Sequence, residues 1–133
     1  DLPSKSNLWN CSKAKTLVIY DSSTANESYL TRIPKCVEIE KTPSDNPELI
    51  SKILAKKGCN KILWECGPRL ATAAIKSNCI QEIITFIAPK ILGGETSMNP
   101  FGDFEFREMN EIIKLHDLKV DLVKNDICVR STF

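Results

Sequence analysis

Apolar and polar positions along the chain alternate in ways that predict several short strands. A continuous apolar run at Thr16–Tyr20 predicts a strand covered on both faces. Alternation at Cys36–Glu40 predicts a strand with one face in water. Apolar runs at Lys61–Glu65 and Ile83–Ala88 predict two more strands, the second of them buried.

Two stretches between these strands carry the signals of helices. Asn46-Pro47-Glu48 supplies a capping side chain, a proline for the first helical position and an acid for the first turn. Gly58 is typical of the residue that ends such a helix. The second helix is expected to follow the turn at Cys66-Gly67-Pro68 and to run through Leu70–Ile75.

The last third of the chain predicts turns and a hairpin. Ile91–Glu95, with Gly93-Gly94 inside it, indicates a turn or a close passage of the backbone, and Thr96–Arg107 is expected to be a loop. Alternation over Glu111–Val123 and Asp126–Phe133 predicts a terminal antiparallel hairpin. In the first of these runs the apolar positions change parity, which predicts a bulge near His116-Asp117.

This order of elements favours one α/β domain over residues 1–133, with a mostly parallel sheet, flanking helices and antiparallel strands at its end. The chain has 133 residues, 42% of them hydrophobic and 26% charged. Its 18 basic and 17 acidic residues leave a net charge of +1, which disfavours nucleic acid as a partner. No apolar run approaches the roughly 20 residues that span a bilayer, so we expect a cytoplasmic protein without a membrane partner.

The cysteines and the histidine give little support to metal chemistry. The six cysteines are scattered without a CxxC pair, and His116 is the one histidine, so we expect no metal site. We expect the thiols to be small core residues. His116 and Asp117 are adjacent on a predicted strand and therefore point to opposite faces, which argues against a catalytic pair.

The turn around Gly67 is the most informative place for a ligand. Glu65 would lie at the carboxyl end of a strand, and Gly67-Pro68 would begin the following helix, whose free N–H groups suit a phosphate. The same pattern also fits a turn built for backbone reasons alone, with Glu65 and Arg69 as solvated surface charges. Gly93-Gly94 is a second place where a ligand could approach the backbone, or simply a turn.

Two motifs in order resemble those of one known family. Ile62–Ala71 contains Glu65-Cys66-Gly67-Pro68, and Ile87–Gly94 contains Ala88-Pro89 followed by Gly93-Gly94. Both resemble the reductase domain of the riboflavin biosynthesis protein RibD, a member of the dihydrofolate-reductase-like superfamily, whose signature is an EGGP turn and then an APxxxGG segment. The last strand, ending at Phe133, is also similar. The resemblance covers nearly the whole chain.

The resemblance implies a dihydrofolate-reductase-like fold and an NADPH-dependent pyrimidine reductase. The reaction would reduce the ribosyl group of 5-amino-6-(5-phosphoribosylamino)uracil to ribityl. By resemblance, Glu65 would contact this substrate, and the protein would be a homodimer. The NADPH phosphates would be held by the turn and the helix start, which are Gly67, Pro68, Arg69, Leu70, Ala71, Thr72 and Ala73. The resemblance assigns no catalytic side chain, since the cofactor carries the hydride.

The chain departs from the family in two places. Cys66 stands where the family has glycine, and a side chain there could crowd the cofactor or exclude an unusual backbone conformation. Asp1-Leu2-Pro3 matches a point inside the family domain, so we expect its first part to be missing. No basic residue is assigned to the cofactor's 2′-phosphate; Ser22, Ser23 and Thr24 are the polar candidates.

Three hypotheses follow. The first is the pyrimidine reductase, active or inactive over these 133 residues. The second is a fragment without catalysis that dimerises through the edge of its terminal hairpin. The third is another nucleotide-dependent reductase of the dihydrofolate-reductase-like superfamily. Binding of NADPH, the state of association and a screen of substrates distinguish them.

Overall fold

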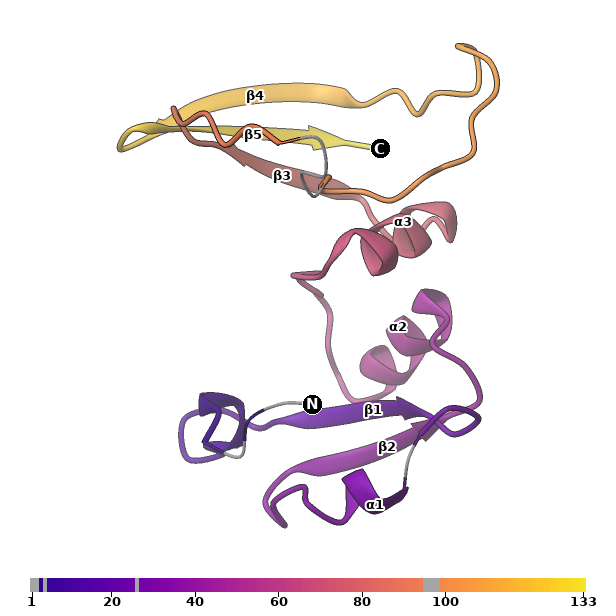
Figure 1. The fold of residues 1–133 in the computed structure, drawn as a ribbon. Coiled ribbons are helices and arrows are strands. Elements are labelled where there is room, and N and C mark those ends of the chain that lie inside the picture. The colour runs from indigo at the N-terminus through magenta and orange to yellow at the C-terminus, as the bar shows by residue number, and fades with distance from the viewer. Residues whose placement is uncertain (1–2, 4, 26, 95–98) are drawn as a thin grey trace. The chain divides into compact units, whose positions relative to one another are not determined.

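The computed structural model describes residue 3 and residues 5–25, 27–94 and 99–133. The chain falls into two compact units, Asp1–Asn60 and Lys61–Phe133, called here the first and the second unit. Figure 1 shows a sheet in each of them. Among the described residues, no helix is both long enough and apolar enough to cross a membrane.

The first unit is built on a parallel pair of strands. The pair runs in register from Leu17 opposite Glu38 to Asp21 opposite Thr42, which confirms both predicted strands, the second displaced by two residues. The two strands are less buried than predicted. All residues of the first strand are half-buried, and Ile39 on the second strand is 42% exposed. The elements are η1 (Asn7–Trp9), β1 (Leu17–Asp21), α1 (Glu27–Leu30), β2 (Glu38–Thr42) and α2 (Pro47–Lys56).

Helix α2 begins and ends where the sequence predicts. The Asn46 side chain accepts hydrogen bonds from the backbone N–H groups of Glu48, at 2.8 Å, and Leu49, at 3.4 Å. At the other end Gly58 has φ +89°, its N–H donates to Ala55 O, and the Cys59 N–H donates to Leu54 O. This is a Schellman motif, and it requires the left-handed conformation that glycine adopts without strain.

The second unit contains one helix and an antiparallel sheet. The strand order is β3-β5-β4, with β5 in the centre (Figure 1). The hairpin is confirmed, with Lys124 at φ +58° in its turn, but its first strand begins at His116 and not at Glu111 as predicted. The bulge is confirmed too, since the register shifts between His116 and Lys119 and Asp117 has φ +52°. The elements are α3 (Pro68–Lys76), β3 (Glu82–Ile87), β4 (His116–Val123) and β5 (Asp126–Thr132).

Three predictions about strands need correction. Lys61–Glu65 is not a strand, because it pairs with no neighbour among the described residues, although Ile62 and Trp64 are half-buried and Leu63 between them is 82% exposed. Strand β3 exists but is not buried, since it is an edge strand and Phe86 on it is 61% exposed. Within the described residues, parallel pairing is confined to β1 and β2.

The prediction of buried cysteines is also wrong. Only Cys128, on the central strand β5, is buried, whereas Cys36 and Cys59 are exposed. The remaining three, Cys11, Cys66 and Cys79, are half-buried. The reason is the small core: the buried apolar residues of the described chain are Val37, Ala74 and Cys128. Most thiols therefore lie near solvent.

Candidate cofactor and substrate site

The predicted site residues lie together on one short segment of the second unit. Glu65 is exposed and precedes the turn, and Gly67 occupies the N-cap position of α3, the residue just before the helix. Pro68 occupies the first helical position, where its missing N–H costs nothing. The segment thus has the predicted turn and helix start, although Lys61–Glu65 directly before them does not form the predicted strand.

The N-terminus of α3 is open. Gly67 has φ −75° and ψ 172°, and no side chain caps the helix. A methyl group added at Gly67 would meet no described atom within 4 Å beyond its chain neighbours. The free N–H groups and the positive end of the helix dipole therefore face accessible space, which is the environment that binds a phosphate.

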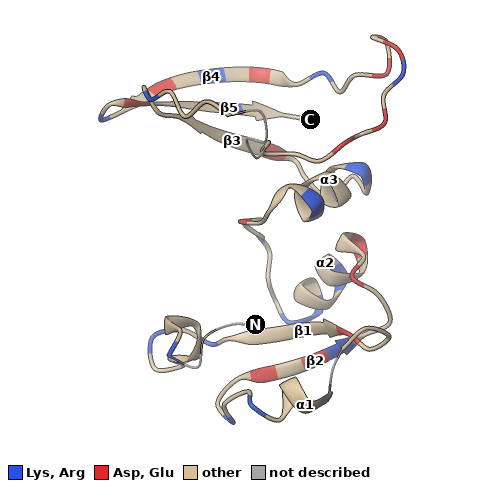
Figure 2. Cartoon of the chain, in the orientation of Figure 1, with Lys and Arg blue, Asp and Glu red and all other residues tan. Residues whose placement is uncertain are grey.

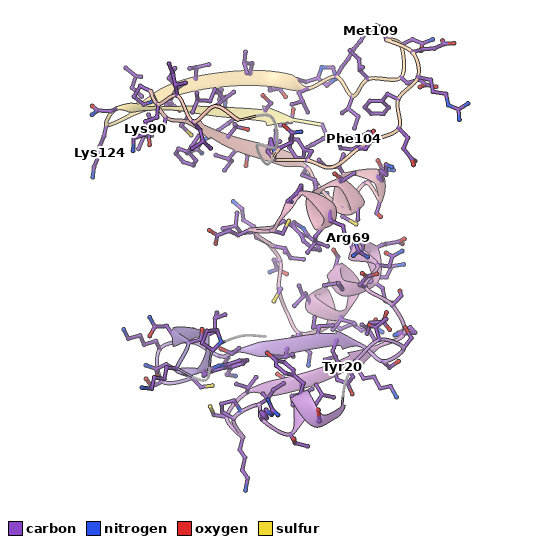
Figure 3. All side chains as sticks on the ribbon, viewed as in Figure 1. Tyr20, Arg69, Lys90, Phe104, Met109 and Lys124 are labelled. Carbon is purple, nitrogen blue, oxygen red and sulfur yellow. The ribbon has the colours of Figure 1, made fainter. Side chains whose placement is uncertain are left out.

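Side chains along α3 divide into an outer and an inner set. Arg69, which is labelled in Figure 3, is exposed and adds a positive charge in the first turn of α3. Thr72 and Ala74 are buried. The remaining predicted residues, Pro68, Leu70, Ala71 and Ala73, are half-buried. Thr72 and Ala74 therefore anchor the helix in its unit, whereas the Arg69 side chain lies at the surface.

A loop from beyond β3 fastens α3 in place. The Gly102 N–H donates to Thr72 Oγ1 at 2.8 Å and to Pro68 O at 3.3 Å. Lys76 at the far end of the helix lies 6.0 Å from the centre of the Phe104 ring, which is labelled in Figure 3, and its Nζ is 3.5 Å from a Glu105 carboxylate oxygen. The hydroxyl of Thr72 is therefore engaged with the protein's own backbone.

Cys66 does not force an unusual conformation on the turn. Its φ lies outside the left-handed region, so the backbone here accepts a side chain without strain. The thiol is half-buried, and burial raises its pKa. Cys66 is therefore a neutral thiol at pH 7 and no activated nucleophile.

The two glycines after Pro89 both have positive φ angles, and no turn is assigned at either of them. Gly93 has φ +65° and Gly94 has φ +111°, which explains why glycine occupies both positions. No described atom beyond the chain neighbours lies within 4 Å of where their side chains would start. The backbone conformation, rather than a close approach within the described residues, requires these glycines. Glu95 and Thr96–Met98 of the predicted turn and loop lie outside the described residues.

The first unit contains a cavity of about 440 Å³ that the sequence did not reveal. It lies where β1 ends, next to α1, and Thr24 and Arg32 are among the residues that line it. Thr24 is one of the three polar candidates, while Arg32 was missed because the short helix α1 has no clear sequence signal. The full lining is Val18, Tyr20, Asp21, Thr24, Ala25, Ser28, Tyr29, Leu30 and Arg32, with Tyr20 labelled in Figure 3.

Charges elsewhere in the described residues do not gather into a second site. Figure 2 shows acidic and basic positions interspersed on β2 and β4. No group of three or more histidine, cysteine or acidic residues among the described ones could hold a metal ion. Asp117, in the bulge, accepts a hydrogen bond from the Thr132 hydroxyl at 2.9 Å, which gives it a structural role.

Comparison with known sequences identifies relatives along almost the entire chain. The sequence model of the RibD C-terminal domain matches residues 1–129. The riboflavin biosynthesis protein PYRR, chloroplastic, of Arabidopsis thaliana is 35% identical over 97% of this chain. The riboflavin biosynthesis protein RibD of Synechocystis sp. is 34% identical over 95% of it. The chain spans only 22% and 34% of the lengths of these two relatives.

Solved structures share the fold. A pyrimidine reductase-like protein from Corynebacterium diphtheriae has a TM-score of 0.77 at 21% identity, covering 99% of this chain and 56% of its own. RibD from Acinetobacter baumannii has a TM-score of 0.75 at 19% identity, covering 98% of this chain and 34% of its own. The predicted dihydrofolate-reductase-like α/β fold is confirmed by this likeness.

Proposed function

The chain belongs to the RibD C-terminal domain family, and from this membership we propose that it acts in riboflavin biosynthesis as an NADPH-dependent pyrimidine reductase. The proposed reaction reduces the ribosyl group of 5-amino-6-(5-phosphoribosylamino)uracil to ribityl. The observation that carries the proposal is the open, uncapped start of α3 within a chain that the family's sequence model matches over residues 1–129.

NADPH fits the residues at the start of α3. The space around Gly67 admits a phosphate to the backbone, and the exposed Arg69 supplies a positive charge. When bound, NADPH supplies the hydride. The residues that would hold it are Gly67, Pro68, Arg69, Leu70, Ala71, Thr72 and Ala73; the hydroxyl oxygen of Thr72 already accepts a hydrogen bond from the Gly102 N–H.

Glu65 is the proposed contact to the substrate. Its carboxylate is exposed and stands two residues before the Gly67 turn, where an ionised acid accepts hydrogen bonds from sugar hydroxyls. Such bonds position the ribosyl carbon and bring no proton of their own. Replacing Glu65 with glutamine keeps the shape but removes the charge.

The first test is titration of NADPH into the chain by calorimetry, with NADH as the second ligand. We expect saturable binding that favours NADPH. Gly67→Ala, which places a methyl group in open space, is expected to weaken binding about tenfold, or about 1.4 kcal/mol, without unfolding the chain. Arg69→Gln is expected to weaken it also, whereas Lys114→Gln, a matched loss of an exposed charge, is not. Equal binding by all variants would remove the Gly67 turn from the site.

The second test measures oxidation of NADPH with the aminouracil substrate. We expect Glu65→Gln to lower turnover while NADPH binding is unchanged. Unchanged turnover would exclude Glu65 from the substrate site. A screen of other carbonyl and sugar substrates separates this reaction from that of another dihydrofolate-reductase-like reductase, because only the latter would prefer a different acceptor.

A homodimer is the second proposal, and one face of the antiparallel sheet supports it. Strand pairing places Ile87, Leu122 and Ile127 on the same face, and their exposed fractions are 51%, 78% and 38%. Exposed apolar surface of this kind is typical of an interface, and a sheet face can pair with itself about a two-fold axis. A dimer is compatible with the reductase and with a fragment that has no activity.

A further inference from the structure

Two cysteines that are distant in sequence meet in the first unit. Cys11 Sγ lies 3.8 Å from the carbonyl oxygen of Trp9, and Cys36 Sγ lies 3.7 Å from the same oxygen. Both thiols donate to this one acceptor at the end of η1. The Cys36 side chain, through a hydrogen-bonding interaction between the two thiols, is also the largest cause of the raised pKa of the Cys11 thiol. The two sulfur atoms are therefore neighbours.

The surroundings of this pair favour disulfide chemistry over metal binding. Among the described residues, no third histidine, cysteine or acidic side chain joins the two thiols in a group that could hold a metal. A structural zinc site needs four ligands, so two thiols alone do not make one. Cys36 is exposed and Cys11 is half-buried, so a small oxidant in solution reaches Cys36 first.

We propose that Cys11 and Cys36 are a redox-active dithiol, which a hydroperoxide converts to an intramolecular disulfide. The Cys36 thiolate attacks one peroxide oxygen, the O–O bond breaks, an alcohol or water leaves, and Cys36 becomes a sulfenic acid. The sulfur of Cys11 then attacks Cys36 Sγ, the S–S bond forms, and the S–O bond breaks with release of water. The two thiols lose two electrons and two protons in total, and the hydroperoxide takes them up.

The disulfide would close a loop around the cavity of the first unit. β1, α1 and every residue that lines the cavity lie between Cys11 and Cys36 in the sequence. Closure restricts the unfolded states of this segment, and so stabilises the arrangement that forms the cavity. Oxidation would therefore fix the cavity walls, and reduction by a thiol would release them.

The test treats the reduced chain with hydrogen peroxide, blocks the remaining thiols by alkylation and maps tryptic peptides by mass spectrometry. We expect the peptide that ends at Lys13 to be joined to the peptide Cys36–Lys41, with the loss of two hydrogen atoms. We expect the thermal unfolding midpoint of the oxidised chain to rise by about 5 °C, and the rise to be reversed by dithiothreitol. Failure of the two peptides to join while Cys36 oxidises to sulfinic acid would overturn the proposal.

Two variants make the result specific. Cys36→Ser is expected to abolish the linkage and the rise in the midpoint, as is Cys11→Ser. Cys59→Ser is the matched control, because Cys59 is exposed like Cys36, and it is expected to leave both unchanged. If Cys59→Ser removed the linkage instead, or if Cys36 formed bonds mainly between chains, the assignment of Cys11 as its partner would be wrong.

Discussion

At the scale of single residues, Gly58 and Gly67 differ in why they are glycine. Gly58 has φ +89° and Gly67 has φ −75°, and a methyl group added at either would meet no described atom within 4 Å beyond the chain neighbours. We therefore predict that Gly58→Ala lowers the free energy of unfolding by about 1 to 2 kcal/mol, because alanine is strained in the left-handed region. Gly67→Ala is expected to change it by less than about 0.5 kcal/mol. Urea denaturation of both variants checks this.

The stability of Gly67→Ala also decides how its NADPH binding is interpreted. If Gly67→Ala folds as stably as the original chain, weaker NADPH binding in that variant reports on the site and not on the fold. If Gly67→Ala lowered the free energy of unfolding as much as Gly58→Ala, this would contradict the negative φ of Gly67 and the positive φ of Gly58.

Signals carried by single residues predicted the local structure most accurately. Asn46 and Gly58 predicted both ends of α2, since each acts through hydrogen bonds within a few residues of itself. The change of parity near His116-Asp117 predicted the bulge for a similar reason. Arg32 was not found, because its place in a cavity depends on α1 and β1 together.

At the scale of elements, Lys57 joins the end of α2 to β2. Its ammonium group forms ion pairs with Glu38 and, at 3.2 Å, with Glu40. The hydrogen bond to Glu38 and then that to Glu40 raise the pKa of Lys57 above its ordinary value of 10.5. While Glu38 and Glu40 are ionised, a raised lysine pKa means that the ion pairs stabilise the fold fully at pH values below the unfolded-state pKa of the lysine, and that this contribution is lost as the pH rises through its folded-state pKa.

We predict that Lys57→Gln is less stable than the original chain at pH 7 and low salt. The difference should shrink with added salt and disappear as the pH rises beyond the folded-state pKa of Lys57. Unfolding curves in urea at several pH values measure it, with Lys41→Gln on β2 as a control that removes an exposed charge. A difference that does not change with pH would show that the lysine acts through packing alone.

The strands were predicted less accurately than the local features that single residues determine. Lys61–Glu65 has the apolar pattern of a strand, and its burial alternates as a strand's would, but it pairs with no neighbour among the described residues. A side-chain pattern reports which positions are covered, whereas a strand also needs a partner that supplies hydrogen bonds. The same limit explains the exposed strand β3, since its position at the edge is decided by strand order.

At the scale of the molecule, the apolar face of the antiparallel sheet bears on assembly. Leu122 on β4 is 78% exposed and faces the same way as Ile127 and Ile87. We predict that the chain sediments as a dimer and that Leu122→Asp shifts it to a monomer, because a charge on this face opposes its burial. Leu63→Asp is the matched control, since Leu63 is 82% exposed but precedes α3 and belongs to no strand of the sheet, and it should leave the dimer intact. A wild-type chain that stays monomeric at high concentration would refute the dimer, and equal effects of both substitutions would place the interface elsewhere.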